Sequence, residues 1–411
     1  MGRRDFLRTV GAAGVGSILY SANIKAEPND PNAETKKQEL VVQQVPKRTL
    51  GKTGVEIPCL SLGLMYDLLE NQIILRKSIQ RGACLWDTAP AYAGGNSEAG
   101  IGRFLSRNPD VRKDVFIVTK ASGARTVKDV EKNLKGSLER LNTSYIDLYY
   151  GVHGLSEPSQ LTNELKQWVK DAKERKLIRF FGFSTHSNIA ENLSAAAGLD
   201  WVDAITTSYN FRLMQDAKVM EAVEACHKSG VGLIAMKTTG KTIVGWAKQD
   251  IETEADKKLV EHLLQKGFSP EQATIKLVLE DKRISSACVG MENVAVLNSN
   301  AEAVLNETKL TEEDFEAFRN YAAATCSGYC AGCANICDSA LPNMRYVSDI
   351  MRYLMYYNTY GDKDRARALF AQIPYQARSR LRATDYGAAE ARCPQRLAIG
   401  KLIAEAVSKL A

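Results

Sequence analysis

Four side chains that can donate, accept or stabilise protons follow one another along the first half of the chain. The apolar segment ACLWDTA leads to Asp87 and to Tyr92 in the next loop, DVFIVTKA leads to Lys120, and IDLYYGVH ends in His153. A carbonyl that accepts a hydride develops negative charge on its oxygen and needs a proton donor beside it. A phenol, with an ordinary pKa of about 10, donates poorly unless a cation stabilises its phenolate.

These residue types together predict an acid–base site for a carbonyl or an alcohol. Tyr92 would be the acid, Lys120 the stabilising cation and Asp87 the partner that holds Lys120 in place. His153 would orient the carbonyl and share the proton in the oxidising direction. Each residue alone also has an ordinary structural explanation, so the prediction rests on their joint occurrence at the ends of successive apolar segments.

A second chemically active group consists of cysteines near the C-terminal end. CSGYCAGCANIC, residues 326–337, has four thiols in twelve positions, and a fifth precedes Pro394; the candidate ligands are Cys326, Cys330, Cys333, Cys337 and Cys393. Such close spacing with a distant Cys-Pro favours one [4Fe–4S] cluster over disulfides. Disulfides or a four-thiolate zinc site are the alternatives. We assign Cys330, Cys333 and Cys393 as ligands, and Cys326 and Cys337 compete for the remaining position.

The spacing of Cys326, Cys330 and Cys333 also matches that of radical S-adenosylmethionine enzymes. Those cysteines normally follow the first strand of a barrel, whereas these follow the eighth apolar segment, so this interpretation is disfavoured.

The elements that must position these groups alternate along the chain. Apolar, mostly unalternated runs predict strands buried on both faces; they occupy residues 56–63, 83–89, 114–121, 146–153, 179–185, 202–210, 231–239 and 284–291. Between them lie helical periods, such as 126–142 and 216–230. Eight strands alternating with helices predict a (β/α)₈ barrel, an α/β fold in which chemistry gathers at the C-terminal ends of the strands. No glycine-rich dinucleotide fingerprint follows any strand, which disfavours an open doubly wound sheet.

Several segments resemble the aldo-keto reductase family over about residues 46–310. They are RTLGKTGVEIPCLSLG, WDTAPAYAGGNSEAGIGRFL, VFIVTKA, SLERLNTSYIDLYYGVHG and GFSTHS. The resemblance implies an oxidoreductase that transfers hydride between a nicotinamide cofactor and a small carbonyl or alcohol, plausibly a sugar derivative. It also implies that Asp87, Tyr92, Lys120 and His153 form a catalytic tetrad.

The same resemblance implies a set of cofactor-binding residues, which are Ser184, Thr185, Thr206, Met236 and Asn300. Thr185 stands where the family more often has Asn, Thr206 where a Gln is frequent, and Met236 where an aromatic ring often stacks. A protein site for the 2′-phosphate of NADP typically contains an Arg that forms paired hydrogen bonds. The stretch GMENVAVLNSN has neither Arg nor Lys. The choice between NADP and NAD therefore stays open, and a tightly bound cofactor is compatible with the sequence.

The C-terminal segment, 311–411, is predicted to be mainly helical. It resembles the ferredoxin-like segment found on some aldo-keto reductase relatives, although its cysteine spacing departs from the ferredoxin run. The cluster would be structural or would pass electrons to a partner.

The N-terminal residues carry an address rather than part of the fold. Arg3 and Arg4 precede a short apolar run that is rich in Gly and Ala, so residues 1–26 resemble a twin-arginine signal peptide. Residues 27–45 are polar and predict a linker. Since this route carries folded, cofactor-loaded passengers, we expect a periplasmic or otherwise extracytoplasmic protein.

Composition excludes several other classes. The 411 residues are 45% hydrophobic and 25% charged, with a net charge of +6 and no block of like charges beyond the N-terminus, so nucleic acid is not an expected partner. The apolar run near the N-terminus is too short to span a bilayer, and no integral membrane protein is expected after signal cleavage. A non-catalytic or regulatory barrel with a structural metal or disulfide tail is the alternative function.

Overall fold

The computed structural model describes residues 42–241, 253–341 and 343–411 of the chain. The predicted signal peptide and all but the last residues of the predicted linker lie outside these ranges. Within them, no helix is long and apolar enough to cross a membrane.

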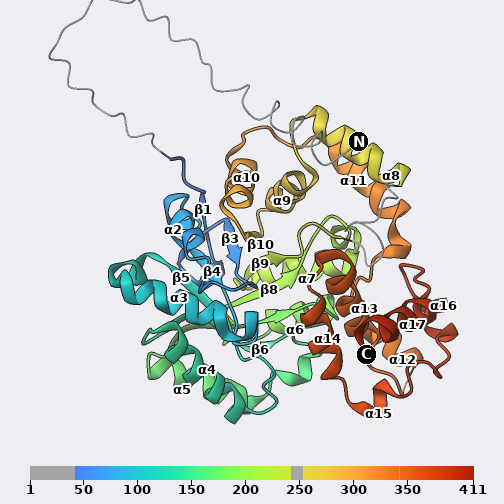
Figure 1. Ribbon diagram of the computed structural model, residues 1–411, viewed down its shortest axis with the longest axis horizontal. Coiled ribbons are helices and arrows are strands. Elements are labelled where there is room, and N and C mark those ends of the chain that lie inside the picture. Colours follow the sequence, from blue (N-terminus) through green and yellow to red (C-terminus); the bar gives the residue numbers. More distant parts are fainter. Residues whose placement is uncertain (1–41, 242–252, 342) are drawn as a thin grey trace, which may run out of the picture. The chain divides into compact units, whose positions relative to one another are not determined.

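A closed barrel of eight parallel strands forms the centre of the described fold (Figure 1). The strand order around the barrel is β10-β3-β4-β5-β6-β7-β8-β9. The strands are β3 (Leu60–Gly63), β4 (Leu85–Asp87), β5 (Phe116–Lys120), β6 (Ile146–His153), β7 (Ile178–Thr185), β8 (Ala204–Ser208), β9 (Gly232–Met236) and β10 (Ile284–Gly290). Each lies within or overlaps one of the eight predicted segments, so the (β/α)₈ prediction is confirmed.

The first predicted strand, residues 56–63, was too long. The segment is interrupted at Cys59, whose N–H donates to the carbonyl of Pro46, and it forms two separate strands. β2 (Glu56–Pro58) pairs antiparallel with β1 (Lys47–Thr49), and only β3 enters the barrel. Leu50 and Ile57 of this hairpin join the apolar side chains inside the barrel, so the hairpin supplies part of the barrel's interior core.

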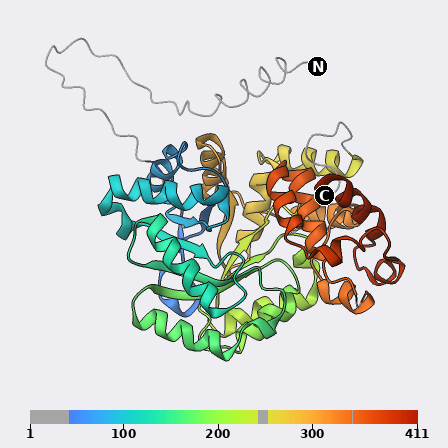
Figure 2. The same cartoon turned by 60° about the horizontal axis from the view of Figure 1, so that its bottom comes forward.

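Helices connect the strands and cover the barrel (Figure 2). They are α2 (Ile73–Gln80), α3 (Asn96–Arg107), α4 (Val127–Leu141), α5 (Asn163–Glu174), α6 (Ile189–Ala197), α7 (Ala217–Lys228), α8 (Glu254–Gln265), α9 (Pro270–Glu280) and α10 (Val294–Leu305). The predicted helix at 126–142 begins with a capping box of Thr126 and Asp129, and it buries Val130, Leu134 and Leu141 as the periodicity indicates.

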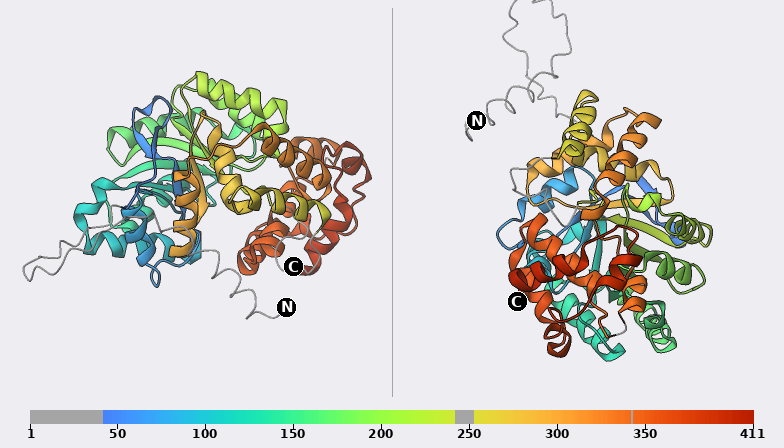
Figure 3. Two further views of the ribbon diagram at one scale, coloured as in Figure 1. Left: turned by 90° about the horizontal axis from the view of Figure 1, so that it is seen from above. Right: turned by 90° about the vertical axis from the view of Figure 1, so that its right-hand side faces the viewer.

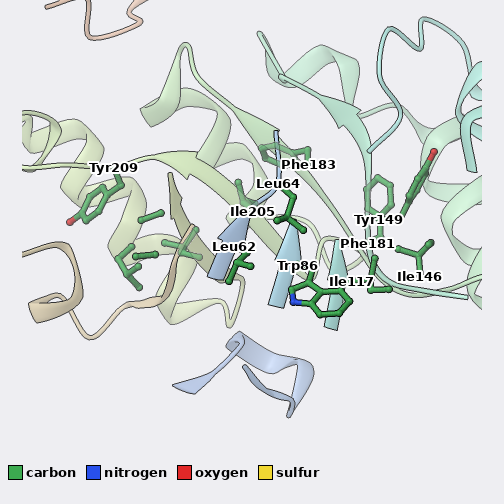
Figure 4. Close-up of a cluster of buried hydrophobic side chains, with 14 of the residues drawn as sticks. Leu62, Leu64, Trp86, Ile117, Ile146, Tyr149, Phe181, Phe183, Ile205 and Tyr209 are labelled. Carbon is green, nitrogen blue, oxygen red and sulfur yellow. The ribbon is translucent and has the colours of Figure 1, made fainter. Parts of the chain in front are cut away.

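The main hydrophobic core lies between the strands and this helical layer. Figure 4 shows Leu62, Trp86, Ile117, Phe181 and Ile205, each from a different strand, pointing away from the barrel interior. Successive residues of a strand point to opposite faces, so their neighbours fill the inside, where Leu85, Phe116, Tyr150 and Ile234 lie. Fully burying one such large apolar side chain contributes about 1.5–3 kcal/mol to the free energy of folding. The packed strands thereby hold their polar end residues in place.

Beyond the barrel the chain is helical. The helices are α11 (Glu312–Ala324), α12 (Ala334–Ala340), α13 (Val347–Met355), α14 (Lys363–Ala371), α15 (Tyr375–Arg378), α16 (Gly387–Arg392) and α17 (Ile399–Leu410), with a π-helical turn at Tyr356–Tyr360. α11 packs with α8 in a cluster around Phe211 and Phe318. The later helices share a second hydrophobic core, which includes Met351 and Leu354. They gather on one side of the barrel in each view (Figures 1 and 3).

Candidate active site

A buried ion pair joins the ends of two neighbouring strands. Asp87 ends β4 and Lys120 ends β5, and Lys120 Nζ lies 2.6 Å from Asp87 Oδ1. The same ammonium donates to the carbonyl oxygen of Thr88 at 2.8 Å. Both charged side chains are buried, and removing either would leave the other unpaired in a poorly solvated place.

Tyr92 lies beside this pair because of an unusual turn. The three residues that follow Tyr92, which are Ala93, Gly94 and Gly95, have positive φ angles of 48°, 63° and 99°. Glycine adopts these left-handed conformations without steric cost, whereas Ala93 does so at some strain. The turn places the buried Tyr92 ring with its centroid 4.7 Å from Lys120 Nζ.

His153 completes the group from the end of β6. Its ring meets the Tyr92 ring edge-on, with 6.0 Å between centroids, and its Nδ1 is 2.8 Å from the hydroxyl of Ser122. The structure therefore brings all four residues of the predicted tetrad to one mouth of the barrel.

The charges of this group determine its protonation. Although burial opposes it, the Asp87 carboxylate raises the pKa of Lys120, which remains an ammonium. Burial also raises the pKa of Tyr92, and Lys120 offsets this only in part because Asp87 acts against it. The prediction of an adjacent ammonium is thus met in geometry, but the phenol ends less acidic than an ordinary tyrosine.

Two histidines at the mouth are neutral. Burial and then the nearby cations Lys120 and Arg365 hold the pKa of His153 well below its usual range. Burial does the same for the pKa of His186, which follows β7 and lies 3.1 Å from the Ser208 hydroxyl. A neutral imidazole can donate or accept a hydrogen bond but carries no charge.

The predicted cofactor residues do not all converge on this mouth. Ser184, Thr206 and Met236 lie at or near the ends of β7, β8 and β9. Ser184 Oγ accepts from the Gly154 N–H at 3.0 Å, and the Thr206 hydroxyl is 2.6 Å from that of Tyr150, among the side chains inside the barrel.

The other two predicted residues have different surroundings. The hydroxyl of Thr185 donates to the carbonyls of Leu155 and Ser187. Asn300 is buried on α10 in the helical layer.

Sequence analysis did not single out the C-terminal cations that reach the mouth. Arg365 of α14 stands 5.2 Å from the centroid of the Tyr92 ring and 5.0 Å from that of Tyr356. Lys237, directly after β9, is 4.6 Å from the Tyr356 ring. Charges spaced along helices usually mark solvated faces, so the sequence carries no signal for this proximity.

A cavity of about 610 Å³, counting its opening to solvent, has Lys237 on its wall, whereas Arg365, Tyr356 and the four residues of the predicted tetrad do not line it. Barrel residues on its wall include His186, Ser208 and Lys237, and C-terminal residues include Arg352 and Tyr360. Its walls therefore come from both parts of the described chain.

A second cavity, of about 300 Å³ counting its opening to solvent, has Cys330, Cys333, Cys337 and Cys393 on its wall, and Cys326 is not part of that wall. All nine cysteines are free thiols. Over residues 42–241, 253–341 and 343–411, no group of three or more His, Cys, Asp or Glu side chains is arranged to hold a metal ion. Burial raises the pKa of Cys330 to about 12 and that of Cys333 to about 11.

Gly332 fixes the cysteine segment against the barrel. Its carbonyl accepts from the N–H of Asn188, at the loop after β7, at 2.8 Å. Its φ is +80°, and a Cβ atom added there would lie 2.3 Å from the carbonyl oxygen of His186. Only glycine fits this approach, which brings the thiol segment next to the loop that carries His186.

Comparison with known proteins identifies the family. The sequence model described as "Aldo/keto reductase family" matches residues 66–323, which is more than half of the chain. The chain belongs to this family. The resemblance inferred from the tetrad segments is thereby confirmed.

Curated relatives of this aldo/keto reductase are distant but nearly fully covered. L-glyceraldehyde 3-phosphate reductase of Escherichia coli O157:H7 is 26% identical over an alignment of 318 residues, and the match covers 66% of this chain and 90% of the relative. L-galactose dehydrogenase of Arabidopsis thaliana is 25% identical over an alignment of 280 residues, and the match covers 62% of this chain and 87% of the relative.

Solved structures support the fold. An aldo-keto reductase from Bacillus halodurans, solved in its holo form, superposes with a TM-score of 0.56 at 20% identity. The match covers 68% of this chain and 96% of that chain. The barrel is therefore that of the family.

Proposed function

We propose that this aldo/keto reductase interconverts a small carbonyl compound and its alcohol by hydride exchange with a nicotinamide cofactor. The buried Lys120–Asp87 pair in contact with Tyr92 is the observation that carries this proposal. Burying a charged pair costs desolvation free energy. Ionisable groups with such perturbed surroundings are typical of functional sites, where they serve reactions such as proton transfer.

Tyr92 acts as the proton donor in the reducing direction. Because burial raises its pKa, the phenol is protonated at neutral pH and has a proton to give. Lys120 stabilises the phenolate that results, and Asp87 keeps Lys120 charged and in place.

His153 orients the substrate oxygen. Its lowered pKa leaves it neutral, so it suits a hydrogen bond to the carbonyl better than the proton-sharing role that the sequence also suggested. Its hydrogen bond with Ser122 fixes the ring for this task.

The nicotinamide, NADP or NAD, supplies the hydride when bound. The donor set at the mouth fits such a group, since Ser184 and Ser208 place hydroxyls at the ends of the adjacent strands β7 and β8. Thr185, Thr206, Met236 and Asn300 remain part of the proposal by resemblance, although the hydroxyls of Thr185 and Thr206 already have partners within the protein.

A sugar or sugar derivative is the proposed substrate class. The two curated relatives are named for L-glyceraldehyde 3-phosphate and L-galactose, which supports this choice.

Replacing Tyr92 tests the role of the phenol. General acid catalysis contributes about 10²- to 10⁴-fold, so Tyr92→Phe should lower kcat by that range with an unchanged dissociation constant for NADPH or NADH, measured by fluorescence titration. Tyr149→Phe is the matched control, because the Tyr149 hydroxyl only donates to the carbonyl of Val130 in the helical layer. Near-normal turnover by Tyr92→Phe would refute the mechanism, and failure of the wild-type chain to bind either nucleotide would favour a non-catalytic barrel.

We also propose that the cavity of four thiols accommodates one [4Fe–4S] cluster, with Cys330, Cys333, Cys337 and Cys393 as ligands. Each iron of such a cluster takes one thiolate, so the ligands surround a volume and need not converge on one point as around zinc. Four thiols on one cavity wall support this proposal.

Iron and acid-labile sulfide analysis of anaerobically purified protein tests the ligand set. Cys393→Ala should lose most of the iron and the broad visible absorption, whereas Cys326→Ala should keep both. Zinc in place of iron, or disulfide-linked thiols in the purified protein, would contradict the cluster.

Export is the remaining proposal about the chain's ends. The Arg3–Arg4 motif supports transport of the folded protein by the twin-arginine route to the periplasm. The double substitution Arg3→Lys and Arg4→Lys should leave the protein in the cytoplasmic fraction; unchanged export would argue against this route.

The cluster's function is also proposed. The thiol cavity and the mouth cavity share Cys330, Ala331, Ser348 and Met351 on their walls. This shared wall is compatible with either a structural cluster or one that relays electrons to a partner protein.

A further inference from the structure

Three cations from separate elements surround one buried phenol at the barrel mouth. Tyr356, in the π-helical turn after α13, is 2% exposed. Arg365 and Lys237 stand over its ring at 5.0 Å and 4.6 Å, and Arg352 of α13 also acts on it electrostatically. π-helical turns are rare and frequently occur at functional sites.

Among the described residues, a carboxylate pairs with only one of these three cations. Arg352 forms an ion pair with Asp349 at 2.6 Å. Neither Lys237 nor Arg365 pairs with a carboxylate within the part of the chain that the structure describes. The polar side-chain contact of Arg365 is with the sulfur of Met65 at 2.9 Å, a weak acceptor. Two partly buried charges are therefore left over, and such charges are costly without an anionic partner.

The surplus charge lies next to the reaction centre. Arg365 lies 5.2 Å from the centroid of the Tyr92 ring and 5.0 Å from that of the Tyr356 ring. Lys237 and Arg352 line the mouth cavity, which also contains His186 and Ser208. Arg365 and Tyr92 do not line this cavity, but Arg365 lies over both the Tyr92 and Tyr356 rings and Lys237 lies over the Tyr356 ring. An anion bound between these cations would therefore lie near the proton donor.

We propose that Arg365, Arg352 and Lys237 form a binding site for the phosphate group of the substrate, and that this protein therefore acts on phosphorylated carbonyl compounds. This rests on the proposed function of the Tyr92 site. A phosphate monoester carries a charge of about −1.5 to −2 at neutral pH, which matches two uncompensated cations better than a carboxylate does. Guanidinium groups suit phosphate oxygens because their N–H donors form paired hydrogen bonds.

The C-terminal helices thus select the substrate. The barrel supplies Tyr92 and Lys237, whereas α13 and α14 supply Arg352 and Arg365. The cofactor's own phosphates are the other source of the same chemistry, and the position of Arg365 over the proton donor favours the substrate.

The test compares a phosphorylated and a neutral substrate of equal length on the full chain. Glyceraldehyde 3-phosphate and glyceraldehyde are reduced with NADPH or NADH by the wild-type protein, by Arg365→Gln and by Arg367→Gln. Arg367 is the matched control on the same helix, since it contacts Tyr357 and the carbonyl of Lys409 on an exposed surface. Because charge-assisted hydrogen bonds are the strong ones, Arg365→Gln should lower kcat/KM for the phosphorylated substrate about 10- to 100-fold. It should change kcat/KM for glyceraldehyde by less than about 3-fold, and Arg367→Gln should change neither.

Other results would overturn the proposal. An equal loss with both substrates would mean that Arg365 acts on Tyr92 alone, and equal use of both substrates by the wild-type protein would exclude a phosphate site. A weaker dissociation constant for the nucleotide without substrate discrimination would assign the cations to the cofactor.

Binding without turnover separates this proposal from the catalytic one. Calorimetry with glycerol 3-phosphate and with glycerol should show binding of the phosphate ester alone, and this binding should be lost in Arg365→Gln and kept in Tyr92→Phe. If the ester binds but no carbonyl is reduced, the phosphate site stands and the proposed function fails. If the ester does not bind the wild-type protein, the phosphate site is rejected whatever the enzyme reduces.

Discussion

Two tyrosines at the barrel mouth have almost the same relation to a lysine and opposite acidities. Lys120 Nζ lies 4.7 Å from the centroid of Tyr92, and Lys237 Nζ lies 4.6 Å from that of Tyr356. Both phenols are buried. Burial nonetheless raises the pKa of Tyr92, whereas the cations around Tyr356 outweigh burial and lower its pKa to about 8.

The difference lies in the counter-ions. Asp87, 2.6 Å from Lys120, cancels much of the field that the ammonium exerts on Tyr92. Lys237 has no such carboxylate partner among the described residues, and Arg352 and Arg365 add to its effect. A lysine beside a phenol therefore does not by itself make the phenol acidic; the net charge around the pair decides.

The same comparison separates the roles of the two sites. Tyr92 keeps its proton at neutral pH and can donate it, as a carbonyl reduction needs. Tyr356 lies within a positive site that favours an anion.

The same substitution at the two lysines should give the largest contrast. Lys120→Met leaves the Asp87 carboxylate buried without a partner, which costs about 3–5 kcal/mol of unfolding free energy. Lys237→Met removes an ammonium that has no carboxylate partner among the described residues, together with its contacts to the Tyr356 and Tyr360 rings, and should change the free energy of unfolding by about 1 kcal/mol or less. Urea unfolding of both variants measures the difference, and equal losses would show that the two lysines are not electrostatically distinct.

Weakening the contact between the cysteine segment and the barrel should have a smaller effect on stability. Gly332→Ala forces an alanine to φ +80° and places its Cβ against the carbonyl of His186. A loss of about 1–3 kcal/mol is expected, mainly in the contact between the cysteine segment and the loop after β7. Hydrogen exchange of the Asn188 amide, which donates to Gly332, reports this contact. Unchanged protection would mean that this contact does not hold the two regions together.

The smallest expected effect is the titration of Tyr356. With a folded-state pKa of about 8 and an ordinary value near 10, its phenol releases a proton on folding between these two pH values. This contribution to stability therefore grows as pH rises through that window and disappears as pH falls below about 8. Relative to Tyr356→Phe, the wild-type protein should gain about 1 kcal/mol at about pH 9.

Ultraviolet absorbance of phenolate gives a direct measure of the same group. The wild-type protein should show one tyrosine ionising near pH 8, and Tyr356→Phe should lose that step while Tyr92→Phe keeps it. Loss of the step in Tyr92→Phe instead would reverse the comparison between the two sites.

Much of the site could be predicted because parallel strands end at one edge of a barrel. Once the apolar runs before Asp87, Lys120 and His153 were recognised as strands, their ends had to meet at one mouth. The hydrogen-bond partners of the Thr185 and Thr206 hydroxyls are the carbonyl of Leu155 and the phenol of Tyr150. They could not be predicted, because these partners lie on other segments of the chain. Which cysteine stands apart was also open, and the cavity wall distinguishes Cys326 from the other four.

By itself, the sequence determined the barrel and the residues of its reactive mouth, because periodic apolar burial and strand ends are local properties of the chain. Only the tertiary structure decided that Arg365, remote in sequence, lies over Tyr92. It also decided that Asp87 offsets part of the lowering effect of Lys120 on the pKa of Tyr92. Electrostatic fields add over all charges nearby in space, and nearness in space between distant segments is not written in the spacing of residues.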